Sequence, residues 1–144
     1  MGAPLTRAQV AEAALAWVGT PYVTGAALRG CGADCVGLVR GLYRETTGRE
    51  LPPPPGWRRD WASGPGRPLV DAARRHLEPI PLEEARPGDV IGFRMGRLGR
   101  LAHCGVLVEG GRVVHAVEGV GVIVARLAPW RGRLAFAARF PGLE

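Results

Sequence analysis

The stretch GCGADCVGLV, residues 30–39, passes from a glycine-broken loop into an apolar run. Asp34 is a strong N-cap residue, because its carboxylate accepts hydrogen bonds from amides that the first helical turn leaves unpaired. Cys35 follows in that first turn, where the positive end of the helix dipole favours a thiolate and lowers the pKa of the thiol. Since the thiolate is the nucleophilic form of cysteine, the sequence predicts a helix that begins at a reactive sulfur.

Helical patterns lie on both sides of this point. Thr6 and Gln9 match a capping box, and the apolar spacing after them predicts a helix that ends at Gly19. A glycine-rich extended loop leads from there to the second helix, for which Gly48 is the expected left-handed C-terminal cap. A third, short helix has Pro68 at its start. The expected helices cover residues 6–19, 35–46 and 68–77.

Strand patterns begin after the turn sequence PGD at residues 87–89. Helices come first and antiparallel strands follow, which is an α+β layout. A chain of 144 residues suits one domain with its own core. We expect residues 1–144 to form a single domain in which N-terminal helices pack on an antiparallel sheet of about five strands. The expected strands cover residues 90–94, 104–109, 112–118, 122–127 and 134–140.

The segment LPPPPGWRRDWASGPG, residues 51–66, interrupts the regular patterns. Proline lacks the amide hydrogen that a helix interior or a central strand needs. Residues 49–67 are therefore expected to run as a loop over the surface.

His103 and His115 lie on either side of a Gly-Gly pair in the expected strands. A two-residue loop at that pair would send the two histidines to opposite faces of the sheet. A three-residue loop with a left-handed glycine instead pairs Val108 with Arg112, and this places His115 opposite Gly105 and diagonal to His103. If the two rings cooperate, the hairpin must therefore have the register of the three-residue loop.

Cys35, His103 and His115 are the residue types of a cysteine hydrolase. Cys35 would attack a carbonyl carbon, and His103 would pair with the thiolate and then protonate the leaving amine. His115 would orient the His103 ring and fix its tautomer, and the backbone amide of Cys35 would stabilise the oxyanion. The alternative is structural, because a cysteine in an apolar helix is often an inert small hydrophobe and a histidine in a strand is often a core residue.

Cysteines and histidines in one chain also raise the question of a zinc site. His103 and Cys104 are neighbours in a strand, so their side chains point to opposite faces and do not readily bind one ion. The sequence also lacks a Cys-x-x-Cys pair. We therefore expect neither a metal nor an organic cofactor, and Cys31 and Cys104 are interpreted as structural or incidental.

The charge and composition of the chain limit which partners and which location are expected. All 19 basic residues are arginine against 13 acidic residues, and the net charge of +6 predicts attraction to an anionic partner. The arginines are scattered and no nucleic-acid-binding signature is present, so we expect no nucleic-acid partner. No apolar run is long enough to cross a bilayer, and no secretory signal opens the sequence. We expect a chain made in the cytoplasm, without membrane insertion and, with three cysteines, without a disulfide framework.

Five segments follow one another along the chain: WVGTPY (17–22), DCVGL (34–38), RPGDV (86–90), HCGVLV (103–108) and VHA (114–116). Together, and in this order, they resemble the NlpC/P60 cysteine peptidases, a compact papain-like family that cleaves the peptide stems of bacterial cell wall. The resemblance implies that Cys35 is the nucleophile, His103 the base and His115 the third polar residue, in agreement with the residue-level interpretation. It adds Tyr22, whose hydroxyl would bind substrate or the oxyanion unless the ring only fills the edge of the core, and Asp34, which would contact the free amine of a stem peptide.

The same resemblance implies hydrolysis, through a thioester, of the bond between D-γ-glutamyl and diaminopimelate or lysine. That substrate is anionic, which agrees with the positive net charge. A sequence with neither an export signal nor wall-binding modules is similar to the stand-alone peptidases of phage tails and gene transfer agents. We therefore expect the partners to be peptidoglycan stem peptides and phage-like tail or baseplate proteins, in a virion-like particle that acts on the periplasmic cell wall.

Two features depart from the family pattern. Cys104 stands where the family more often has a small or aliphatic residue, and the proline-rich loop with Trp57 and Trp61 is unlike the usual connection. Trp57, Trp61 and the nearby arginines could form a docking surface, since Trp and Arg favour interface hot spots, or the loop could pack on its own domain. Two other functions stay open: an amidase or acyltransferase on the same fold, and a structural tail or baseplate component with weak or lost activity.

Overall fold

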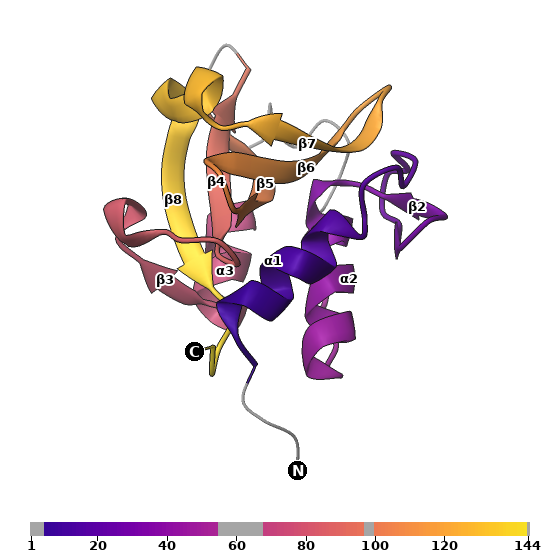
Figure 1. Ribbon diagram of the computed structural model, residues 1–144, viewed down its shortest axis with the longest axis horizontal. Coiled ribbons are helices and arrows are strands. Elements are labelled where there is room, and N and C mark those ends of the chain that lie inside the picture. Colours follow the sequence, from indigo (N-terminus) through magenta and orange to yellow (C-terminus); the bar gives the residue numbers. More distant parts are fainter. Residues whose placement is uncertain (1–4, 55–67, 97–99, 144) are drawn as a thin grey trace.

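The structure is a computed structural model, of which we describe residues 5–54, 68–96 and 100–143. Within these residues a six-stranded antiparallel sheet is packed beside three α-helices (Figure 1). The α+β class that the sequence predicts is confirmed. The proposed docking residues Trp57 and Trp61 lie outside the described residues.

The first helix, α1 (Arg7–Leu15), begins at the predicted capping box. The Gln9 amide donates to Thr6 Oγ1 at 3.2 Å, and the Thr6 amide donates to Gln9 Oε1 at 2.9 Å. The helix ends earlier than predicted, and the chain continues through turns to Gly19. Trp17, in these turns, is fully buried against Gly41 of the second helix.

The second helix, α2 (Cys35–Thr47), matches its prediction closely. Asp34 is its N-cap, and Gly48 closes it in the left-handed region with φ of 75°. Its buried face includes Leu38, Val39 and Leu42, and Figure 1 shows it beside α1. The third helix, α3, is Pro68–His76. None of the described helices is both long and apolar enough to cross a membrane.

The strand order of the large sheet is β3-β8-β4-β5-β6-β7. The edge strand β3 has three residues and pairs with β8, and it was not predicted from the sequence. A two-stranded sheet, β1 (Ala27–Leu28) with β2 (Gly32–Ala33), lies in the loop before α2 and was not predicted either. The strands of the large sheet are β3 (Glu78–Ile80), β4 (Val90–Met95), β5 (Arg100–Val108), β6 (Arg112–Val117), β7 (Gly121–Arg126) and β8 (Leu134–Arg139).

The two faces of the sheet bury different sets of residues. Cys104, Val106 and Val108 of β5 belong to the main core, together with the apolar faces of α1, α2 and α3. Leu107 belongs to a second, smaller cluster on the opposite face, which includes Phe93 and has Trp130 packed against it. Because side chains alternate along a strand, β5 contributes to both clusters.

The turn before β4 is fixed by a fully buried carboxylate. Asp89 accepts from the Nε and Nη2 of Arg139 at 2.9 Å each, and from the Arg86 amide at 3.0 Å. A Cβ at Gly88 would lie 2.5 Å from the carbonyl oxygen of Arg7, so the position also requires glycine for space. The RPGD segment thus joins the start of β4 to α1 and β8.

Candidate active site

Asp34 places Cys35 at the start of α2. One carboxylate oxygen of Asp34 accepts from the Gly37 amide at 2.7 Å, as an N-cap does, and the other accepts from the Gly25 amide at 2.7 Å. Asp34 is only 1% exposed, and both hydrogen bonds are to backbone. Its predicted capping role is confirmed, and the bond to Gly25 also fixes the preceding loop against the helix.

The β5–β6 hairpin has the register that cooperation between the histidines requires. Val108 pairs with Arg112 across a three-residue loop. A Cβ at Gly105 would lie 3.0 Å from the Cβ of His115, which confirms their close approach. The Nε2 of His103 lies 2.8 Å from the Nδ1 of His115, so the two rings are hydrogen bonded.

An irregularity in β5 precedes His103. Phe93 pairs with His103, but the next residue of β4, Arg94, pairs with Leu101, so Ala102 is an extra residue in the strand. Bulges of this kind bend a strand and change the direction of nearby side chains. His103 and its neighbour Cys104 both form side-chain hydrogen bonds with Cys35.

Cys35 has a depressed pKa although it is only 4% exposed. The hydrogen bond from Cys104 and then the hydrogen bond and charge of His103 outweigh burial, and they lower the pKa of Cys35 from 9.0 to about 6. The negative charge of Asp34 acts in the opposite direction. These contacts therefore favour the thiolate form of the Cys35 sulfur.

His115 is a neutral hydrogen-bond acceptor in this arrangement. Burial, and then the charge of His103, lower the pKa of His115 from 6.5 to about 4. A protonated His103 donates through Nε2, and His115 accepts at Nδ1, which puts the hydrogen of neutral His115 on Nε2. That Nε2 is buried and finds no hydrogen-bond partner among the described residues.

Two aromatic residues that the sequence analysis missed surround the histidine pair. The ring centroid of Trp130, from the 3₁₀ helix η3 (Ala128–Arg133), is 5.4 Å from that of His115 at an interplanar angle of 80°. The centroid of Phe93 is 5.6 Å from that of His103. The pairing of Phe93 with His103 follows from the β4–β5 register, but the position of Trp130 depends on a connection that has no periodic pattern.

Tyr22 lies beside the segment that leads into α2. It forms an isolated parallel bridge with Ala33, and its half-buried ring packs on the main core. The structure thus brings the backbone of Tyr22 close to the start of α2, and the packing of its ring agrees with the alternative in which the ring fills the edge of the core. The substrate-binding role of its hydroxyl stays a prediction. Cys31, in contrast, is exposed.

Cys104, interpreted from the sequence as structural or incidental, is buried in the main core, and its Sγ lies 3.3 Å from the carbonyl oxygen of Cys35. Its side chain contacts the candidate nucleophile. In the described part of the chain, no group of three or more His, Cys, Asp or Glu side chains could hold a metal ion.

Comparison with known proteins identifies the family. The NlpC/P60 family model matches residues 19–139, a range that includes Tyr22, Asp34, Cys35, His103 and His115. The chain belongs to the NlpC/P60 family. Its helices and antiparallel sheet match those of solved NlpC/P60 structures. The crystal structure of the NlpC/p60 domain of the peptidoglycan hydrolase SagA has a TM-score of 0.68 and 27% identity, over 94% of this chain and 100% of that chain.

Curated relatives of this NlpC/P60 chain include hydrolases from two bacteria. The γ-DL-glutamyl hydrolase of Bacillus subtilis is 26% identical over 136 residues, which cover 93% of this chain and 29% of that protein. The murein DD-endopeptidase MepS/murein LD-carboxypeptidase of Escherichia coli K12 is 29% identical over 125 residues, 85% of this chain and 57% of that protein. The chain therefore spans only part of the length of these relatives.

Proposed function

We propose that this NlpC/P60 chain is a cysteine-type endopeptidase that cleaves peptide stems of peptidoglycan. The observation that carries the proposal is the contact of the Cys35 sulfur with His103, whose far nitrogen is 2.8 Å from His115. A low-pKa thiol, a base and an orienting partner are the parts that nucleophilic catalysis by cysteine needs. The relatives named for murein and γ-glutamyl hydrolysis support the substrate class.

The reaction proceeds in two steps. The Cys35 thiolate attacks the carbonyl carbon, and the imidazolium of His103 protonates the leaving amine as the carbon–nitrogen bond breaks, which leaves a thioester on Cys35. Neutral His103 then takes a proton from water, which attacks the thioester and releases the acid and the Cys35 thiolate. His115 accepts from Nε2 of His103 throughout, which keeps the other ring nitrogen directed at the sulfur.

The start of α2 supplies the stabilisation of the developing oxyanion. The amide of Cys35 is in the first turn, where the helix dipole is positive. Tyr22, held beside Ala33, would place its hydroxyl as a second donor or as a substrate ligand. The Asp34 carboxylate already accepts hydrogen bonds from two backbone amides. A contact with the amine of a stem peptide would come in addition to these.

For the bond that is cleaved, we propose the one between D-γ-glutamyl and the diamino acid. The γ-DL-glutamyl hydrolase relative supports this choice. The relative named murein DD-endopeptidase favours a second candidate, the cross-link between stems. Mass spectrometry of purified muropeptides after digestion distinguishes the two, because the first cleavage shortens a single stem and the second separates a dimer. Loss of all products in Cys35→Ala is expected, and unchanged digestion by that variant would refute the proposal.

Delivery on a phage-like tail or baseplate is a separate part of the proposal, and its support is the resemblance to the peptidases of phage tails and gene transfer agents. Particles purified from the producing cell should contain the chain in constant stoichiometry with tail proteins. Recovery of the chain away from any particle would refute delivery and leave the proposed chemistry unaffected.

A further inference from the structure

Cys104 is a second sulfur in direct contact with the candidate nucleophile. It follows His103 in β5, and it is 2% exposed. Its Sγ lies 3.3 Å from the carbonyl oxygen of Cys35, and its thiol also forms a hydrogen bond with the Cys35 side chain. The same short strand segment therefore supplies both the base and a second thiol to Cys35.

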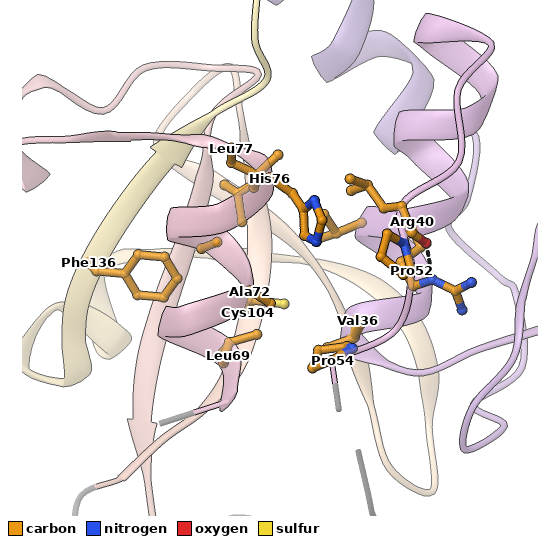
Figure 2. A pocket seen from close by; sticks show the side chains of 14 residues that line it. Val36, Arg40, Pro52, Pro54, Leu69, Ala72, His76, Leu77, Cys104 and Phe136 are labelled. Carbon is orange, nitrogen blue, oxygen red and sulfur yellow. Dashed lines mark hydrogen bonds between the residues drawn. The ribbon is translucent and has the colours of Figure 1, made fainter. Parts of the chain in front are cut away.

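The far side of Cys104 faces an apolar cavity of about 50 Å³ between α2 and α3 (Figure 2). Figure 2 shows Leu69 and Ala72 of α3 on one side and Val36 of α2 on the other, with Cys104 between them. Burial disfavours a charged sulfur. The hydrogen bond with Cys35, and then burial, raise the pKa of Cys104 well above 9.0, so this thiol keeps its proton while Cys35 loses its own.

We propose that Cys104 is a positioning residue whose S–H donates to the Cys35 thiolate and holds it in its reactive, deprotonated form. Cys104 has one proton and two acceptors within reach, the carbonyl oxygen and the sulfur of Cys35. When Cys35 is a thiol, the S–H bonds the carbonyl oxygen. When Cys35 is a thiolate, the bond to sulfur is charge-assisted and stronger. Paired cysteines in Cys-x-x-Cys motifs likewise have a lowered pKa at one sulfur.

Other charged groups near the two sulfurs come from three elements. His103 of β5 favours the thiolate, and Asp34 at the start of α2 disfavours it. Arg40 of α2 and His76 of α3 line the cavity, and the Nε of Arg40 donates to the carbonyl oxygen of Leu51 at 2.8 Å. None of these groups changes when Cys104 is replaced, so a shift in the titration of Cys35 reports on the S–H donor.

The test is the pH dependence of alkylation of Cys35 by iodoacetamide, with the labelled peptide identified by mass spectrometry. In Cys104→Ala the midpoint should move upward by about one pH unit, the size expected for one hydrogen bond to a charged group. At pH 6 the labelling rate should then fall roughly fivefold, since a pKa near 7 leaves about a tenth of the sulfur ionised. Cys104→Ser keeps a hydrogen-bond donor, so its midpoint should lie close to the wild-type value.

Val106→Ala is the matched control, because Val106 is the next residue on the same face of β5 and is fully buried. It should leave the midpoint unchanged. An unmoved midpoint in Cys104→Ala, or an equal shift in Val106→Ala, would overturn the proposal. If Cys104→Ala does not fold, Cys104→Val removes the donor while filling the space.

The activity part of this inference rests on the proposed peptidase function, but the labelling does not require a substrate. A shifted titration in a protein that cleaves no muropeptide would refute the proposed function and leave the role of Cys104 standing. For an active enzyme, the acid limb of kcat/KM should shift with the labelling midpoint.

Discussion

The His103–His115 hydrogen bond permits a quantitative prediction. In His115→Ala the acceptor 2.8 Å from Nε2 of His103 is lost, and the ring of His103 is no longer held toward Cys35. Because His103 is charged when it is paired with the thiolate, the bond is of the charged class, which contributes about 1.5–3 kcal/mol. If the variant loses that much stabilisation of the transition state, kcat/KM falls by roughly tenfold to somewhat more than a hundredfold.

The assay is kcat/KM on a purified muropeptide for wild type, His115→Ala, His115→Asn and His76→Ala. His115→Asn should recover part of the loss, since its amide oxygen can accept from His103 as in Cys-His-Asn sites. His76 lies on α3 beside the apolar cavity, and its replacement controls for the loss of a histidine elsewhere in the fold. Thermal unfolding of each variant separates lost catalysis from lost structure.

Two results would refute this reasoning. If His115→Ala were as inactive as Cys35→Ala, which should lose several orders of magnitude in rate, His115 would have to transfer a proton itself. If a folded His115→Ala kept the wild-type rate, the hydrogen bond would have no part in directing His103.

Three further predictions follow from particular contacts. In Gly105→Ala, the new methyl group would lie 2.8 Å from the carbonyl oxygen of Val114 and 3.0 Å from Cβ of His115. Stability and activity should therefore both fall, and normal activity with an unchanged unfolding temperature would contradict this. Asp89→Ala should lower the unfolding free energy by about 1.5–3 kcal/mol, because it removes the charge-assisted hydrogen bonds that the buried carboxylate accepts from Arg139. Glu50→Gln in an exposed pair should cost less than about 1 kcal/mol, and equal losses in denaturant titrations would contradict the first estimate. His115 binds a proton near pH 6.5 in the unfolded state but only near pH 4 in the folded state, so the unfolding free energy should fall as the pH is lowered from 6.5 to 4. The fall should be smaller in His115→Gln. Parallel curves of unfolding free energy against pH for the two proteins would show that His115 is not neutral in the folded state.

Local sequence patterns were sufficient to predict the parts of the site that depend on one element or one hairpin. Asp34 before Cys35 predicts a helix start because the N-cap preference is a property of adjacent residues. The requirement that His103 and His115 share a face predicts the three-residue loop that the structure contains, because side chains alternate strictly along strands.

The missed features depend on contacts between distant segments. The edge strand β3 includes Pro79 and has no alternating pattern, and its pairing with β8 defines it as a strand. Trp130 reaches the histidines from a 3₁₀ connection whose direction no periodicity predicts. The contact of Cys104 with Cys35 requires the position of α2 relative to β5, which alternation alone does not give. Alternation did place Cys104 on the opposite face from His103, and this was the available signal that it would face the helices.

The most direct test of the account is to find the acyl group on the enzyme. Wild-type protein mixed with a muropeptide and quenched in acid within one turnover should give a proteolytic peptide in which Cys35 carries the acyl part of the substrate as a thioester. His103→Ala should form this species far more slowly, because His103 protonates the leaving amine, and Cys35→Ala should not form it. Substrate cleavage without an adduct on Cys35, or with the adduct on Cys31 or Cys104, would contradict the assignment of the nucleophile.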